Sequence, residues 1–372
     1  MEVLITGAGG FIGRALVARL RAGATVRDAQ GRLVRPQRLV LCDVEPGSSD
    51  DQAFGGIVSG QGPHDGKGLP EGKCGAGAMA EVGVPPALAW RIGSVADRAF
   101  VRTLVSADTA CVFHLAGVVS GAAEADFDAG MRVNLDGTRN LLEALAARPA
   151  GAGRHSGNEP GVRRPVRLVH ASSIAVYGMP LPPQIDDGTQ PWPTLSYGAH
   201  KLAGELLVND LSRRGLVDGR SLRLSGVIVR PAQPNGALSA FNSDIFRETL
   251  AGRPVVSPVS PAATIWVQTI GRTVDNLLHA AALEPAAFGR QRAVLLPALA
   301  CRIDEIVAAI AEVAGPEARQ LVSYRPDERV EPMFGRWPKP FTATRGRDLG
   351  FTADEDLVSM VRGFAAARMG SA

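Results

Sequence analysis

The feature that most constrains this chain is a glycine cluster between two apolar runs near its start. Residues 3–13 read VLITGAGGFIG and lead into the apolar run 15–20. This pattern predicts a strand, a tight turn and a helix. Gly7 permits the turn, Gly10 lets backbone N–H groups approach a pyrophosphate, and Gly13 lets the helix pack closely on the strand. Since a helix N-terminus attracts anions, we expect a nucleotide-binding segment rather than a purely structural turn.

Strand and helix patterns alternate along the rest of the first 230 residues. Further strand-like runs occupy residues 38–43, 89–93, 110–117, 166–173 and 222–231. Such alternation predicts an α/β fold, a Rossmann-type doubly wound parallel sheet that binds ligands at the carboxyl ends of its strands. After residue 230 the pattern becomes irregular. We therefore predict a nucleotide-binding domain at 1–230 and, at 231–372, mainly a smaller C-terminal substrate-binding lid, some segments of which can return to the sheet.

Two stretches rich in Gly and Pro interrupt this pattern, at about 45–86 and 149–165. Segments of this composition bury too little apolar surface to order themselves, so we expect long surface loops. His64 and Cys74 in the first stretch match no metal-ligand spacing, and the sequence predicts no metal site. The four cysteines are scattered, which predicts free, mostly buried thiols in a reducing compartment.

The composition argues against several functional classes. With 40 basic and 37 acidic residues, the net charge of +3 indicates no basic surface for nucleic acid. No signal segment precedes the first strand, and no apolar run approaches the roughly 20 residues that span a membrane. We expect a cytoplasmic protein that binds a small molecule, without nucleic-acid or membrane partners. The sequence leaves the oligomeric state open, a homodimer included.

Asp43 ends the second strand of the sheet, 38–43. In a dinucleotide fold this position meets the adenosine ribose, where a carboxylate binds the hydroxyls of NAD and repels the 2′-phosphate of NADP. The separation from the glycines exceeds the usual spacing of about 20 residues, and a hairpin-like insertion before the strand would accommodate the excess. An aspartate that only starts a turn is the alternative. The pattern favours NAD over NADP.

Tyr197 and Lys201 form a candidate catalytic pair, because residues four apart lie on one face of a helix. A tyrosine with the usual pKa of about 10 is a weak base at neutral pH, and a nearby ammonium and a positive nicotinamide ring favour its phenolate. The phenolate could take a proton from a substrate hydroxyl while hydride leaves the same carbon. Only four residues of the chain are lysines, so this spacing is rarely a coincidence. An ordinary helix surface is the alternative.

Four other polar residues are candidates for the site, because they lie at predicted strand ends or in the following helix. Ser173 can donate to a substrate hydroxyl or a developing oxyanion. Ser172 is an equally available hydroxyl, and strand alternation sends the two serines to opposite faces. His114 is better interpreted as a hydrogen-bonded structural histidine than as a catalytic one. Asn134 either satisfies local backbone groups or supports the catalytic site.

The glycine turn, the strand-end serine and the Tyr-x-x-x-Lys spacing, in that order, resemble the extended short-chain dehydrogenase/reductase superfamily, the group of NAD-dependent epimerases and dehydratases. Residues 114–117 (HLAG) and 172–178 (SSIAVYG) match it too. The resemblance implies that Ser173 orients the substrate, Tyr197 accepts the proton and Lys201 binds the nicotinamide ribose. It implies NAD contacts at Gly7, Gly10, Phe11, Ile12, Gly13, Asp43, Val95, Leu115, Ala116, Asn134, Tyr197, Lys201 and Pro231.

Within this superfamily the chain resembles the D-erythronate dehydrogenase group. The matching segments are 229–236, 245–248, 276–280, 337–341 and 348–351. The resemblance implies NAD-dependent oxidation of a four-carbon sugar acid, D-erythronate or a near relative, to its 2-keto form. A carboxylate substrate needs a cation or several donors, for which Arg247, Asn235 and Ser239 are the candidates, beside Ser173. A surface position is the alternative for Arg247.

Other functions remain open from sequence. A nucleotide-sugar 4-epimerase uses the same Tyr, Lys and Ser, although residues 265–267 lack the tyrosine- and arginine-rich run that such enzymes often have. A dehydratase would need an acid pair where Ile174 and Ala175 stand. A non-catalytic NAD(P)-sensing protein would have no use for the base at Tyr197. Ser94 replaces an aspartate that contacts adenine in many members, which leaves that contact undecided.

Overall fold

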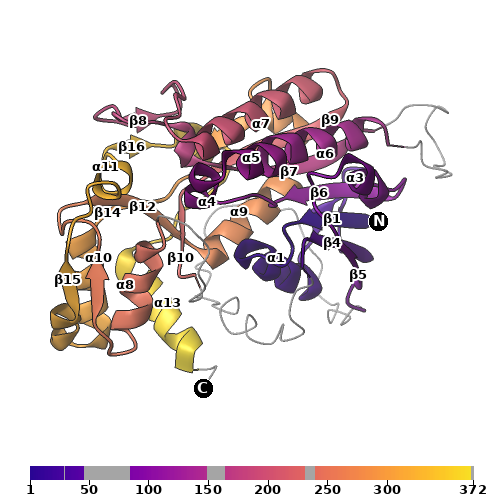
Figure 1. The fold of residues 1–372 in the computed structure, drawn as a ribbon. Helices are drawn as coiled ribbons and strands as arrows, with labels where there is room; N and C mark the ends of the chain where they lie inside the picture. The colour runs from indigo at the N-terminus through magenta and orange to yellow at the C-terminus, as the bar shows by residue number, and fades with distance from the viewer. Residues whose placement is uncertain (29, 46–83, 149–163, 231–238, 370–372) are drawn as a thin grey trace.

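One parallel sheet forms the centre of the molecule (Figure 1). The computed structural model describes residues 1–28, 30–45, 84–148, 164–230 and 239–369. The strands of the sheet are β1 (Glu2–Thr6), β4 (Arg38–Asp43), β5 (Ala87–Ile92), β6 (Thr109–His114), β7 (Val166–Ser173), β9 (Val217–Leu224) and β13 (Ala293–Leu295). Their order is β13-β9-β7-β6-β1-β4-β5. The predicted doubly wound sheet is confirmed, and its order reverses beside β1, where such sheets bind ligands.

Helices cover both faces of this sheet. On one face lie α1 (Phe11–Arg21) and α9 (Ile270–Ala282), and on the other α3 (Arg98–Leu104), α6 (Gly137–Ala146) and α7 (Ser196–Arg213). Strand alternation divides the core accordingly: Val3 and Ile5 pack toward α1 and α9, and Leu4 packs toward α3 and α6. Helices cover both faces of β1, so its residues 3–5 are apolar on both faces, which explains the continuous hydrophobic run.

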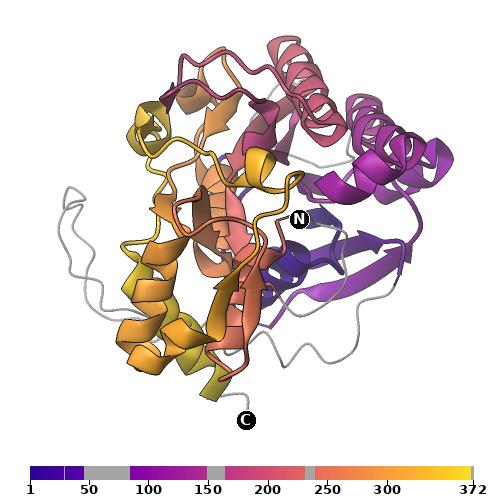
Figure 2. The same cartoon turned by 60° about the vertical axis from the view of Figure 1, so that its left-hand side comes forward.

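A smaller unit, called the lid here, lies at the carboxyl ends of the strands. It contains the sheet β10 (Gly226–Ile228), β12 (Thr264–Thr269) and β14 (Leu299–Arg302), with helices α8 (Phe241–Thr249), α10 (Ile303–Ala314) and α13 (Leu357–Met369). Its own core includes Ile245, Ile306 and Val361. Figure 2 shows the orange and yellow lid elements on the left and the indigo and purple strands on the right.

Shorter elements make up much of the remaining described chain. They are β2 (Val26–Arg27), β3 (Leu33–Val34), α4 (Ser120–Ala125), α5 (Phe127–Gly130), η2 (Met131–Asp136), η3 (Ile174–Val176), β8 (Ile185–Asp186), β11 (Val255–Ser257), η4 (Pro285–Phe288), η5 (Pro316–Leu321), β15 (Val322–Tyr324), α11 (Glu331–Phe334), β16 (Phe341–Thr342) and α12 (Thr344–Asp348). β2 and β3 pair antiparallel, so the expected hairpin-like insertion before β4 is present. Most of the two predicted surface loops falls outside the described residues.

The predicted strand at 222–231 was wrong in its bounds. β9 begins earlier, at Val217, and ends at Leu224, while β10 belongs to the lid sheet and pairs with β12. β9 carries charged side chains that are buried in pairs: Arg220 with Asp218, and Arg223 with a glutamate of α7. Asp218 and Arg220 lie in the first half of β9, which is why a hydrophobic pattern does not detect that half. The chain therefore passes from the sheet to the lid at Ser225, before residue 230, and β13 returns to the sheet beside β9.

Candidate active site

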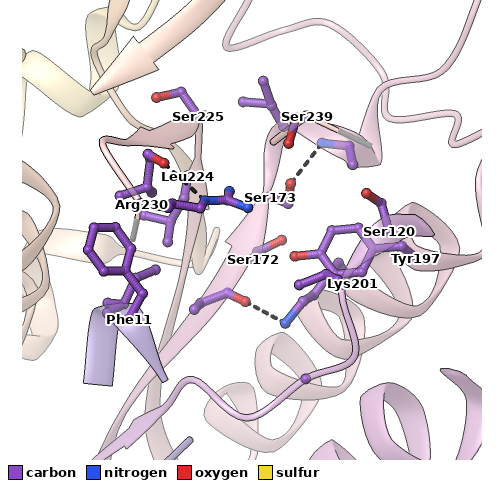
Figure 3. Close-up of a pocket in the computed structure, with 18 of the residues that line it drawn as sticks. Phe11, Ser120, Ser172, Ser173, Tyr197, Lys201, Leu224, Ser225, Arg230 and Ser239 are labelled. Atoms are coloured by element: carbon purple, nitrogen blue, oxygen red, sulfur yellow. Dashed lines mark hydrogen bonds between the residues drawn. The ribbon is translucent and has the colours of Figure 1, made fainter. Parts of the chain in front are cut away.

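A cavity of about 420 Å³ opens where the lid meets the ends of the central strands. Its wall combines the glycine turn, the segment after β6, the end of β7, the start of α7 and several lid residues (Figure 3). The lid contributes apolar side chains, namely Ile265, Trp266, Phe334 and Trp337. The cavity therefore lies at the position that the doubly wound topology predicts for a ligand.

The glycine turn has a shape that fits a dinucleotide pyrophosphate. Gly7 has a φ of 73°, and a Cβ there would lie 2.6 Å from the Ala116 nitrogen. A Cβ on Gly13 would lie 2.1 Å from the Gly7 carbonyl oxygen. No side chain caps the N-terminus of α1, and its first turn contains no acidic residue. The positive end of the helix thus faces the cavity without a neutralising side chain, so these residues fit NAD.

Asp43 stands next to this turn, at the end of β4. Its Oδ2 accepts a hydrogen bond of 2.9 Å from the Gly9 nitrogen, and its Oδ1 accepts one of 2.8 Å from the Val44 nitrogen. The carboxylate therefore serves a local turn and lies beside the phosphate-binding segment at the same time. Its contact with the ribose stays a prediction.

Tyr197, Lys201 and Ser173 converge on the cavity (Figure 3). α7 begins at Ser196, so Tyr197 lies in its first turn and Lys201 one turn later, with Nζ 5.6 Å from the centre of the tyrosine ring. The Lys201 ammonium donates to the Ala171 carbonyl oxygen at 2.8 Å. Ser173 lies close to Tyr197, and its hydroxyl acts to lower the pKa of the phenol. A strand end and a helix start thus bring two hydroxyls and one ammonium to the same place.

The electrostatics differ from the sequence prediction in one respect. Burial raises the pKa of Tyr197 above its usual value, while the charge of Arg230 and the Ser173 hydroxyl act in the opposite direction. Burial lowers the pKa of Lys201 to about 8. The Lys201 ammonium points to a backbone carbonyl, so the cation that most favours the phenolate is Arg230. The sequence did not indicate Arg230 as a site residue.

Ser172 and Ser173 have different partners. The Ser172 hydroxyl donates to Glu205 at 2.6 Å, and Glu205 pairs with Arg223 at 2.7 Å. The Ser173 hydroxyl accepts from the Ala175 nitrogen at 3.1 Å, which leaves its proton available to the cavity. This geometry favours Ser173 as the substrate-orienting hydroxyl.

His114 and Asn134 are both buried. The two ring nitrogens of His114 lie 2.7 Å from the Thr6 hydroxyl and 3.0 Å from the Thr138 hydroxyl. Burial lowers the pKa of His114 to about 3, so the ring is neutral and structural, as expected. The Asn134 side chain binds the N–H and C=O of Val118 at 2.8 and 3.0 Å. Asn134 therefore satisfies backbone groups of the segment that follows β6.

The other predicted contacts fall into three groups. The cavity lining includes Gly7, Gly10, Phe11, Ile12, Gly13, Leu115, Ser173, Tyr197, Lys201 and Ser239. Val95 packs against Gly137 and Ala116 lies against Gly7, and neither lines the cavity. Ser94 accepts a local backbone hydrogen bond from Ala96. Pro231 and Asn235 fall outside the described residues.

Arg247 does not line the cavity. Its guanidinium pairs with Asp244 and with Glu248, the latter at 3.0 Å, and it donates to the Arg230 carbonyl oxygen at 2.9 Å. Its charge is therefore already neutralised on α8. Arg230, Ser225 and Asn242 line the cavity instead. The sequence contained a signal for Arg230. A charged residue that directly follows the apolar run of a predicted strand is expected at the edge where ligands bind.

Other kinds of site find little support in the part of the chain that the structure describes. That part contains no cluster of three or more His, Cys, Asp or Glu side chains suited to a metal, and none of its helices is long and apolar enough to cross a membrane. Cys42, Cys111 and Cys301 are free and buried, and burial raises the pKa of each thiol to about 12. His64 and Cys74 lie outside the described residues.

The chain belongs to the NAD dependent epimerase/dehydratase family, whose model matches residues 3–261. A protein from Cupriavidus necator named D-erythronate dehydrogenase is 37% identical over 98% of both chains. A Haemophilus influenzae protein of the same name is 33% identical over 70% of this chain and 78% of that one. A nucleoside-diphosphate-sugar epimerase structure from Agrobacterium tumefaciens has 33% identity and a TM-score of 0.78, covering 100% of this chain and 95% of that chain. The resemblance is confirmed, and these matches indicate an NAD-dependent dehydrogenase.

Proposed function

We propose that this protein oxidises a four-carbon sugar acid, D-erythronate or a close relative, at C2 to the 2-keto acid. The observation that carries the proposal is the convergence of Tyr197, Ser173 and Lys201 in one cavity with the glycine turn. The two relatives named D-erythronate dehydrogenase support the substrate class. The three free buried cysteines support a reducing cytoplasm as its location.

The residues act on the C2 hydroxyl in the proposed reaction. Ser173 donates a hydrogen bond to the C2 oxygen and holds it beside the Tyr197 hydroxyl. Tyr197, as the phenolate, accepts the hydroxyl proton as the C2–H bond breaks and the C2=O bond forms. When bound, NAD supplies the hydride acceptor in its nicotinamide ring. Lys201, anchored on the Ala171 carbonyl, binds the nicotinamide ribose and adds positive charge next to the phenolate.

The apolar side of the cavity excludes water from this reaction. Trp266 and Trp337 pack with ring centres 5.0 Å apart, and the Trp266 indole donates to the Pro338 carbonyl oxygen at 2.8 Å. Ser239, which also lines the cavity, supplies a hydroxyl for the polar side of the substrate. A low-dielectric wall strengthens the hydrogen bonds that Ser173 and Tyr197 make.

The test is to follow NADH formation with NAD and a panel of four-carbon aldonates, beside an assay of UDP-sugar epimerisation. We expect NADH with D-erythronate, a 2-keto acid as product and no epimer. A nucleotide-sugar 4-epimerase is the second candidate, because the Agrobacterium tumefaciens structure is described as a nucleoside-diphosphate-sugar epimerase. Epimer formation without net NADH would replace our proposal with this alternative.

Asp43→Ala is expected to weaken the preference for NAD over NADP by about 10-fold or more, because a carboxylate at this position repels the 2′-phosphate. The measurement is kcat/KM with each cofactor. Asp97→Ala is the matched control, since Asp97 caps α3 by accepting from Ala99 at 2.9 Å and does not line the cavity. An unchanged cofactor ratio in Asp43→Ala would show that another residue reads the ribose.

A further inference from the structure

The proposed reaction uses the charge of Arg230 only to favour the Tyr197 phenolate and assigns it no contact with the substrate. Arg230 follows β10 and lines the cavity together with Tyr197 and Ser173. In Figure 3 its guanidinium extends toward the centre of the cavity, with Tyr197 on the opposite side. Its backbone nitrogen donates to the Ser243 hydroxyl at 3.0 Å, and its Nε donates to the Val227 carbonyl oxygen at 3.1 Å. The first bond fixes the backbone and the second fixes Nε, so the two terminal nitrogens of the guanidinium are left to face the cavity.

The described lining of the cavity contains cations and no carboxylate, so it suits an anionic ligand. The cations are Arg14, Lys201 and Arg230. Arg14 lies in α1 beside the glycine turn, and Lys201 is held by the Ala171 carbonyl. Among the described residues, no Asp or Glu forms an ion pair with Arg230, in contrast to Arg247. Arg230 is therefore the cation on the lid side, where the substrate lies.

The chemistry of a 2-hydroxy acid restricts where its carboxylate can bind. The carboxyl carbon is bonded directly to C2, the carbon whose hydroxyl proton goes to Tyr197. The cation that binds the carboxylate must then be a close neighbour of the Tyr197 hydroxyl. Arg230 meets this condition, because it lines the same cavity as Tyr197 and its guanidinium extends toward the side on which Tyr197 stands (Figure 3). The effect of its charge on the pKa of Tyr197 agrees with this placement. Burial also lowers the pKa of Arg230, so its poorly solvated charge gains from an anionic partner.

Two unpaired polar atoms accompany Arg230. The Ser225 hydroxyl and the Asn242 side-chain oxygen are buried and have no hydrogen-bond partner in the described structure. Ser225 is 8% exposed and Asn242 is 5% exposed, and both residues line the cavity. Buried polar atoms of this kind are costly unless a ligand pairs with them. They are suited to the hydroxyl groups of a sugar acid.

We infer that Arg230 binds the substrate carboxylate through a two-point ion pair, and that Ser225 and Asn242 bind substrate hydroxyls beside it. The inference rests on the proposed function, because it names the residue that selects an acid over a neutral polyol. It replaces Arg247, whose charge is paired on α8, as the carboxylate-binding residue. A guanidinium suits this task, since its planar fork matches both carboxylate oxygens.

The test compares D-erythronate with its neutral amide, which keeps every hydroxyl and loses the charge. Arg230→Gln is expected to lower kcat/KM for the acid on the order of 100-fold or more. The amide should lose clearly less, because it loses only the support that Arg230 gives to the Tyr197 phenolate. Arg230→Lys should recover part of the acid activity as a point charge. Arg247→Gln is the control, and any loss that it causes should be equal for acid and amide. Equal losses for both substrates in Arg230→Gln would overturn the inference.

A binding measurement separates this inference from the proposed function. D-erythronate is titrated calorimetrically into Tyr197→Phe with NAD present, in the presence and absence of the Arg230→Gln change. Binding that depends on Arg230 supports the inference, even if the wild-type protein forms no NADH and the proposed function fails. Equal binding with and without Arg230, or no binding in either protein, would overturn it.

Discussion

Replacement of Tyr197 by phenylalanine is expected to lower kcat by about 10²- to 10⁴-fold, the range that a positioned general base contributes. The change removes the oxygen that accepts the substrate proton and keeps the ring, which packs in the first turn of α7. Affinity for NAD should change little, because the glycine turn and Lys201 stay in place. The measurements are NADH formation under saturating substrate and NAD binding by calorimetry.

Tyr177→Phe is the matched control for this variant. The Tyr177 hydroxyl is buried and accepts from Arg223 at 2.8 Å, and Tyr177 does not line the cavity. Its loss should cost about 1 kcal/mol of stability and leave most of the turnover. A Tyr197→Phe enzyme with the wild-type rate would refute Tyr197 as the base.

Gly13→Ala is expected to abolish measurable NAD binding and to destabilise the fold by about 1–3 kcal/mol. The new Cβ would lie 2.1 Å from the Gly7 carbonyl oxygen and 2.7 Å from the Ala8 Cα. Both neighbours are backbone atoms of the turn, so α1 would have to move away from β1. That movement would take the helix N-terminus out of line with the pyrophosphate. Calorimetric titration with NAD and urea unfolding measure the two effects.

Gly271→Ala provides the comparison, since its new Cβ would have only the Thr269 hydroxyl within reach, at 4.0 Å. Gly271 lies in α9, where alanine is favoured over glycine by about 1 kcal/mol. This variant should bind NAD normally and be at least as stable as the wild-type protein. Normal NAD affinity in Gly13→Ala would mean that the turn does not hold the pyrophosphate.

Local sequence was sufficient for the parts of the site in which the chemistry lies within one turn and its flanking elements. The spacing of Gly7, Gly10 and Gly13 predicted the phosphate-binding turn, and both outer glycines are sterically required. The four-residue interval between Tyr197 and Lys201 predicted their common helix face. The hairpin before β4 followed from the extra length between the turn and Asp43. These features depend on backbone geometry at short range, which sequence patterns report directly.

Long-range packing decided the rest. Sequence could not rank Arg230 above Arg247, because both are arginines near the start of the lid and only the fold shows that Asp244 and Glu248 already pair with Arg247. It could not give the first half of β9, since Asp218 and Arg220 are charged and pair inside the fold. It could not detect the break between β9 and β10, because only the fold shows that β10 pairs with β12 of the lid.

The sequence by itself determined the family, the cofactor-binding turn and the Tyr-Lys pair, because each depends on residues that are close together in the chain. The tertiary structure alone decided which charges are neutralised and which face the cavity. The free energy of a buried charge depends on the partners that the fold places around it. Some are near in the chain, as Asp244 is to Arg247, and others are distant, as Glu205 is to Arg223, so the sequence alone does not say which pairs form.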